Sequence, residues 1–243
     1  MATFLVRHSN RRRDNLFFSG MALLILAAVL VGFARTYFLA GIFRAPLPNL
    51  LIHIHGAVFT SWIILLIAQT SLVVAGRVDL HRRLGVLGFC LACLVFALGL
   101  LAATDGLVRG RAPATAVQAR IFYAVPIADM IVFPLLIYFA FRNRTNPAAH
   151  KRYILIATIT LLDAAFVRWP AHVPWWDLHI AEMCCFVLLP FIAGYDLWSS
   201  GRVQRATLWA SVFVIAMQLL RHPIGHTAAW QSFAAWVQIH ARI

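Results

Sequence analysis

Residues 84–103 read LGVLGFCLACLVFALGLLAA, twenty consecutive residues without a charged side chain. The hydrocarbon core of a bilayer is about 30 Å thick, and a helix of roughly 20 apolar residues crosses it. The sequence therefore predicts an all-α integral membrane bundle of about seven transmembrane helices, in which internal prolines kink but do not break the helices. The six further apolar runs, and the prolines within them, are Phe17–Ala34, Leu50–Val74, Ile121–Phe141, Tyr153–Trp169, Leu178–Trp198 and Ala206–Leu220, with Pro126, Pro134 and Pro190.

The composition excludes a water-soluble domain and argues against a nucleic-acid-binding protein. Hydrophobic residues make up 62% of the chain and charged residues 12%, which leaves too little polar surface to coat a soluble globule. The formal net charge is +13, but the basic residues stand in short clusters between the apolar runs. Membrane lipids and other membrane subunits of a complex are therefore the expected partners, and nucleic acid is not.

The basic residues also orient the chain. With residues 1–16 as a basic cytoplasmic N-terminus, the inner segments hold thirteen of the twenty-one Lys and Arg residues. Short loops rich in these residues stay in the cytoplasm. The sequence thus predicts one transmembrane domain of a bacterial inner membrane, with the bundle over residues 17–221, the N-terminus inside and the C-terminus outside. Within residues 227–243, Trp230, Phe233 and Val237 recur at helical spacing, which predicts an amphipathic helix on the outer surface, with a disordered tail as the alternative.

Three charged residues lie inside the predicted spans. Asp129 and Asp163 fall near the middle of theirs, and Arg168 lies near an outer end. Ionisable groups at such depth cost at least about 2.5 kcal/mol each on insertion scales, so each one needs a reason. Structural pairing, for example of Asp129 with Arg168 or Arg120, is the preferred interpretation, and a proton relay through the two aspartates is the alternative.

The predicted topology gathers other ionisable residues in the outer leaflet. His53 and His55 begin the second run, and His179 and Glu182 begin the sixth, three residues apart on one helix face. These four residues are candidates for a cofactor site, with haem b as the leading cofactor because haem takes imidazoles from different helices. The alternative, preferred for the histidines at 172, 222, 226 and 240, is hydrogen bonding to headgroups and backbone carbonyls.

Two similar basic triplets begin runs at the inner boundary. His81-Arg82-Arg83 precedes the third run, and His150-Lys151-Arg152 precedes the fifth. We expect these residues to hold an anionic lipid or a quinone headgroup. Gly76-Arg77-Val78 likewise recurs as Gly201-Arg202-Val203, which is consistent with stacked helical hairpins or simply with short basic inner turns.

A longer pattern supports the membrane assignment. From Leu50 to Gly85 the chain reads HIHG…W…Q…HRRLG, formed by residues 53–56, Trp62, Gln69 and residues 81–85. With the later stretch HKRYILIATITLLDAAFVR, residues 150–168, this pattern resembles a family of polytopic bacterial membrane proteins that has no assigned activity. The chain also bears a fainter likeness to di-haem transmembrane cytochromes, which implies haem-ligating histidines on several helices.

The expected function follows from these candidates. The leading hypothesis is a membrane-embedded, cofactor-associated protein that binds b-type haem or quinone, or a subunit of an electron-transfer complex. A small transporter or a lipid-interacting scaffold without a cofactor is the second. A membrane zinc hydrolase is the third, with His55, His222 and His226 as metal ligands, because residues 222–226 have the HxxxH spacing. A retinal protein is excluded because the single lysine, Lys151, lies in an inner turn.

Overall fold

The computed structural model describes residues 2–46, 48–109, 115–169 and 178–241, with the backbone alone for residues 2–11 and 178–185. Within these ranges the secondary structure is helical, without a β-strand. The helices are α1 (Ala2–Phe33), the π-helix η1 (Ala34–Phe38), α2 (Ala40–Phe43), α3 (Leu50–Val74), α4 (Val78–Val108), α5 (Ala116–Arg142), α6 (Pro147–Ile159), the 3₁₀-helix η2 (Thr160–Leu162), α7 (Asp163–Phe166), α8 (Leu178–Ser200), α9 (Arg205–His226) and α10 (Ala228–His240).

Five segments of the described chain are long and apolar enough to cross a membrane. They are Arg12–Phe38, which joins most of α1 to η1, and the helices α3, α4, α5 and α9. This confirms the prediction of an all-helical, multi-pass membrane architecture. The prolines of α5 and α8 lie inside continuous helices, as expected from the tolerance of buried helices for proline.

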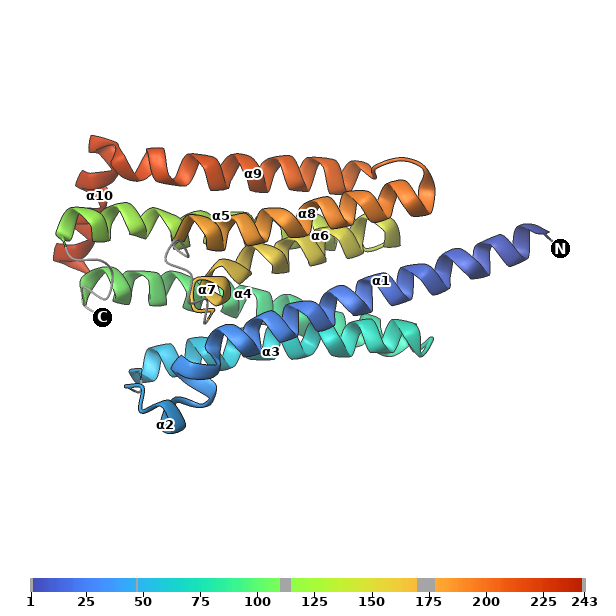
Figure 1. Cartoon of the computed structure of the whole chain (residues 1–243), viewed down its shortest axis with the longest axis horizontal. Coiled ribbons are helices and arrows are strands. Elements are labelled where there is room, and N and C mark those ends of the chain that lie inside the picture. Colours follow the sequence, from blue (N-terminus) through green and yellow to red (C-terminus); the bar gives the residue numbers. More distant parts are fainter. Residues whose placement is uncertain (1, 47, 110–114, 170–177, 242–243) are drawn as a thin grey trace.

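The long helices lie side by side, and three of their connections meet at one end (Figure 1). These are the turns from α3 to α4, α5 to α6 and α8 to α9, which carry Arg77, Arg144 and Arg202 and which we call the basic end. Gly76 and Gly201 have φ of +73° and +70°, a left-handed conformation that glycine adopts without steric cost. The repeated Gly-Arg-Val triplet therefore reflects a similar backbone conformation at the two turns.

Helix α5 occupies the centre of the bundle, in contact with α4, α6, α9 and α10. Its Phe133 and Leu136 are buried, as are Ile156 and Ile159 of α6 and Ile192 of α8. The side chains of Asn49, Thr115 and Asn146 cap α3, α5 and α6 by accepting a hydrogen bond from a backbone N–H of the first turn. The core thus lies around α5 and α6, between the other helices.

The fifth predicted span differs from the expectation of one continuous helix over Tyr153–Trp169. Helix α6 ends at Ile159, a 3₁₀ turn follows, and α7 begins at Asp163. Thr160 Oγ1 lies 2.8 Å from the carbonyl oxygen of Ala157, three residues earlier. Threonine hydroxyls bind nearby carbonyls in this way and compete with the regular helical pattern. The break sets Asp163 at the start of a new helical segment.

Helix α10 lies across the end opposite the basic end (Figure 1). Its Ala234 and Val237 are buried, and Trp230 Nε1 donates to the carbonyl oxygen of Arg120 at 2.8 Å. Phe233 and Trp236 are exposed on the helix surface. The C-terminal segment is therefore helical and packed on the bundle, while its location on an outer membrane surface stays a prediction.

Candidate functional site

A chamber of about 1000 Å³ lies between α1, α3, α4, α5 and α6, next to the basic end. Part of its wall is apolar, formed by residues such as Phe18, Trp62, Leu66, Ile137 and Leu155. The ionisable and amide side chains that line it are Asp14, Asn15, Gln69, His81, Arg82, Arg144, His150 and Lys151. Four of the six residues expected at the inner headgroup site, those at 81, 82, 150 and 151, therefore border one cavity.

The two histidines of this cavity lie next to each other on its wall, edge to face. His81 stands on the first turn of α4 and His150 on the first turn of α6, with ring centroids 6.3 Å apart and planes at 87°. His150 Nδ1 lies 2.8 Å from the carbonyl oxygen of Ala140. Because a carbonyl oxygen only accepts hydrogen bonds, Nδ1 carries the proton, and Nε2 of the neutral ring is an acceptor.

Gln69 fixes the opposite tautomer of His81. Its amide satisfies its surroundings when the nitrogen donates to His81 Nδ1 at 2.6 Å and the oxygen accepts from the backbone N–H of Gly85 at 3.0 Å. His81 Nδ1 is then an acceptor, and Nε2 carries the proton of the neutral ring. The chamber is therefore bordered by one imidazole donor and one imidazole acceptor.

Sequence reasoning included Gln69 in the family pattern but not in the site. Its place on the chamber wall follows from its spacing, because it is seven residues after Trp62, which is two helical turns along the same face of α3. This heptad spacing is the signal that could have identified it.

An acidic side chain balances part of the positive charge. Lys151 Nζ lies 2.6 Å from Asp14 Oδ2 and 4.5 Å from the centroid of the Phe18 ring. Tyr195 OH donates to the other oxygen of Asp14 at 2.5 Å. Burial lowers the pKa of Lys151 from its ordinary value, while the Asp14 carboxylate acts to raise it. The Arg144 guanidinium, in turn, lies 4.6 Å from the centroid of the Phe141 ring.

The other two residues of the inner triplets have different roles. Arg83 is exposed and does not line the chamber. Arg152 is buried and pairs with Asp196 of α8, with Nε 2.9 Å from Oδ1. Asp196 also accepts from Thr207 Oγ1 at 2.6 Å and from the backbone N–H of Gln204 at 3.0 Å. Asp196 was missed by sequence reasoning although it lies inside the sixth predicted span, and this location alone could have identified it.

The histidines of α3 contact different neighbours. His53 Nδ1 lies 3.2 Å from the hydroxyl of Tyr37 on η1. His55 Nδ1 lies 3.3 Å from the carbonyl oxygen of Leu98 on α4, and its ring is 4.2 Å from that of Phe59. Being two residues apart, the two rings point in different directions, so these histidines do not form one ligand pair.

The remaining members of the expected cofactor and metal sites do not form a described centre. The side chains of His179 and Glu182 lie outside the described residues, as does His172 altogether. His222 is half-buried and His226 exposed at the end of α9. Among the residues with described side chains, no three His, Cys, Asp or Glu residues are arranged to hold a metal ion. The geometry therefore does not support the zinc site expected from His55, His222 and His226.

Asp163, which is buried, and Asp129, which is partly buried, share a partner that sequence reasoning missed. Arg221 of α9 is almost completely buried and places Nη2 2.8 Å from Asp163 Oδ2 and Nη1 3.4 Å from Asp129 Oδ1. Gln218, one turn earlier, donates to Asp163 Oδ2 at 3.2 Å. Arg221 lies one residue beyond the predicted seventh run and was therefore not counted as intramembrane.

Asp129 therefore lies beside Arg221, and not beside Arg168 or Arg120, the two partners named as examples of structural pairing. Arg168 is exposed on the bundle, donates to the carbonyl oxygen of Ala164 and lies over the Phe33 ring. Arg120 donates to Gln238 Oε1 at 2.7 Å and so helps to fix α10. Which cation reaches a buried carboxylate depends on the rotation of each helix, and the apolar runs do not define that rotation.

The fold and the chamber define a multi-pass α-helical membrane protein with an amphipathic internal cavity. No protein-family model, curated protein or solved structure matches the chain.

Proposed function

We propose that this protein binds a membrane quinone in the chamber, with the oxygenated ring beside His81 and His150. The observation that supports the proposal is the matched pair of imidazoles next to an apolar wall. A quinone carbonyl accepts a hydrogen bond from His81 Nε2, and the hydroxyl of the quinol donates to His150 Nε2. One cavity can thus bind both forms of the ligand through uncharged histidines.

The chamber is lined by one carboxylate, Asp14, which is paired with Lys151, and by two further cations, Arg82 and Arg144. The charges alone would therefore also accept an anionic headgroup. A quinone is proposed because the paired imidazoles and the apolar wall suit an uncharged oxygenated ring. Quinone is also proposed in place of haem, because the two α3 histidines expected to ligate haem contact separate neighbours.

The membrane arrangement proposed with this function has seven crossings, formed by α1, α3, α4, α5, the broken α6–α7 segment, α8 and α9. The basic end then lies in the cytoplasm of a bacterial cell, which agrees with the rule that short basic loops stay inside. The N-terminus is inside and the C-terminus outside. In this arrangement the chamber lies near the inner face of the bilayer, where it can exchange ligand with partner subunits of an electron-transfer complex.

Binding of a short-chain quinone to the purified protein in quinone-free nanodiscs tests the proposal. We expect saturable binding by wild type and weaker binding by His81→Gln and His150→Gln. A hydrogen bond contributes about 1 kcal/mol net, so each substitution should raise Kd by roughly five- to tenfold. His240→Gln is the matched control, because His240 is exposed on α10, away from the chamber.

Two results would contradict the proposal. One is the absence of saturable binding by folded wild-type protein. The other is equal binding by the two chamber variants and the His240 control. Displacement of the quinone by an anionic phospholipid, with unchanged quinone affinity in the histidine variants, would instead support a lipid-binding scaffold.

A further inference from the structure

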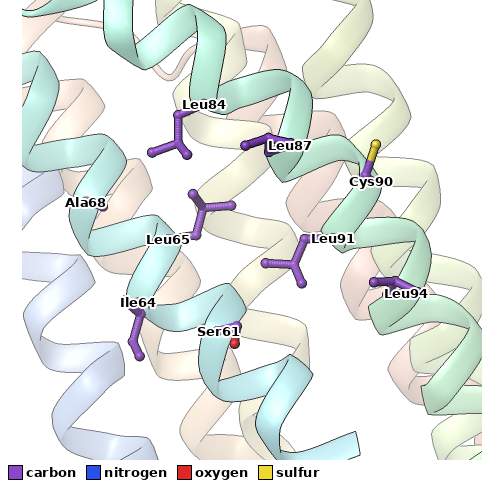
Figure 2. A pocket seen from close by; sticks show the side chains of 9 residues that line it. All are labelled: Ser61, Ile64, Leu65, Ala68, Leu84, Leu87, Cys90, Leu91 and Leu94. Atoms are coloured by element: carbon purple, nitrogen blue, oxygen red, sulfur yellow. The ribbon is translucent and has the colours of Figure 1, made fainter. Parts of the chain in front are cut away.

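A second cavity of about 500 Å³ lies on the outer side of the α3–α4 pair, and nearly all of its wall is apolar. Figure 2 shows Ile64, Leu65 and Ala68 from α3 on one side of this groove and Leu87, Cys90 and Leu94 from α4 on the other. Ile64 and Leu87 are 59% and 64% exposed, so the groove faces the surroundings of the bundle. In a membrane those surroundings are lipid chains.

Leu65 lines both the groove and the chamber. It packs against Gly88 of α4, where a Cβ atom would lie only 3.0 Å from Leu65 Cδ2. Leu65 is thus the residue shared by the two linings, and the absence of a side chain at Gly88 leaves room for it between the helices. A leucine side chain changes rotamer without movement of the backbone, so this contact is easier to open than a backbone contact.

Aromatic pairs stand at two other places around the chamber. Trp62 packs edge-on against the fully buried Phe133, with ring centroids 5.2 Å apart, in the bundle core. Between α4 and α5, Phe89 contacts Phe141 with ring centroids 5.1 Å apart. Displacing an aromatic pair requires two bulky side chains to move together, whereas Leu65 at the α3–α4 seam is a single aliphatic side chain.

We propose that the α3–α4 groove holds the isoprenoid tail of the quinone bound in the chamber, and that the tail passes between the helices at Leu65 and Gly88. The inference rests on the proposed quinone site and adds the length of ligand that the protein accepts. Because lipid chains are as apolar as the groove, the groove gains little by hydrophobicity alone. Its role is to position a tail that is too long for the chamber.

The native cysteines of α4 give a direct test. Cys90 lines the groove, whereas Cys93, also exposed and one turn further along α4, does not. Two single-cysteine proteins are needed, one keeping Cys90 and one keeping Cys93, with serine at the other three cysteine positions. The measured quantity is the rate at which N-ethylmaleimide modifies the cysteine in detergent. Three conditions are compared: no ligand, a tailless quinone, and a quinone with the same headgroup and a long isoprenoid tail.

We expect the long-tailed quinone alone to protect Cys90. At a free concentration ten times Kd, full protection of the bound state would slow modification by about tenfold. The rate at Cys93 should stay the same in all three conditions. Equal rates at Cys90 with both ligands, when titration shows that both bind, would overturn the groove proposal and leave the quinone site intact. Binding of neither ligand would refute both.

A seam variant gives an independent result. Gly88→Ala places a methyl group against Leu65, so it should reduce affinity for the long-tailed quinone by about fivefold more than affinity for the tailless ligand, although Gly88 also borders the chamber. Gly106→Ala, on the same helix with no atom near the added Cβ, is the matched control. Equal loss of both ligands in Gly88→Ala would overturn the role of the seam, because it would indicate general disruption of the chamber.

Discussion

The Arg152–Asp196 pair is predicted to be among the largest polar contributions to stability at the basic end. Both side chains are at most 4% exposed, and Asp196 accepts hydrogen bonds from the Arg152 guanidinium, Thr207 Oγ1 and the backbone N–H of Gln204. The substitution Arg152→Met removes the cation and keeps most of the side-chain volume. The carboxylate would retain the other two donors but would have no counter-charge from Arg152.

Removing one partner of a buried ion pair typically costs 3–5 kcal/mol, because the remaining charge stays desolvated, so we expect a loss of about that size for Arg152→Met. Thr207→Val removes a single hydrogen bond to a charged acceptor and should cost about 1.5–3 kcal/mol. The double substitution Arg152→Met with Asp196→Leu should cost less than the sum of its two single substitutions, because no isolated charge is left in the core.

The assay is reversible unfolding by a denaturing detergent, followed by circular dichroism, on wild type and the four variants side by side. Arg142→Met is the matched control, since Arg142 is exposed at the end of α5 and should change the free energy of unfolding by no more than about 0.5 kcal/mol. A loss below about 1 kcal/mol for Arg152→Met, or strict additivity in the double variant, would refute the reasoning.

Two further predictions concern contacts on α1 and α9. A Cβ atom at Gly32 would lie 2.3 Å from the carbonyl oxygen of Ala165, so Gly32→Ala should destabilise, whereas Gly20→Ala, with nothing nearby, should be neutral or stabilise by up to about 1 kcal/mol. Thermal unfolding compares the two, and equal effects would argue against close packing of α1 on α7. Arg221→Met should lower the free energy of unfolding by about 3–5 kcal/mol, and Arg168→Met should lower it far less. The same detergent unfolding measures both variants. The reverse order would contradict the pairing of Arg221 on α9.

The apolar runs predicted the positions of most long helices. The run Leu50–Val74 has the same bounds as α3. The runs near α4, α5 and α9 lie inside longer helices, which extend several residues further at both ends of α4, at the start of α5 and at the end of α9. The extensions carry polar and charged residues, which a hydropathy criterion excludes but an α-helix accommodates once it leaves the hydrocarbon core. Helix boundaries were therefore underestimated where the sequence changes from apolar to basic.

The candidate site was predictable only in part. The two inner triplets include His81 and His150, which border one chamber. Their opposite tautomers were not predictable, because they depend on Gln69 and the Ala140 carbonyl, which come from neighbouring helices. Depth along a helix can be read from a sequence, but the rotation of an almost uniformly apolar helix cannot. Contacts between helices, and hence tautomers and ion pairs, depend on that rotation.

Helix α6 explains how these features combine. It is short and only moderately apolar, and it is bound to its neighbours by polar contacts: Arg152 pairs with α8, and Thr158 Oγ1 accepts from Trp62 of α3 at 3.2 Å. Asp163, just beyond the 3₁₀ turn, pairs with α9. Because protein surrounds α6 on several sides, its polar groups find partners that lipid cannot offer. These contacts fix α6 along its length and thereby hold His150, one turn from its start, against the chamber.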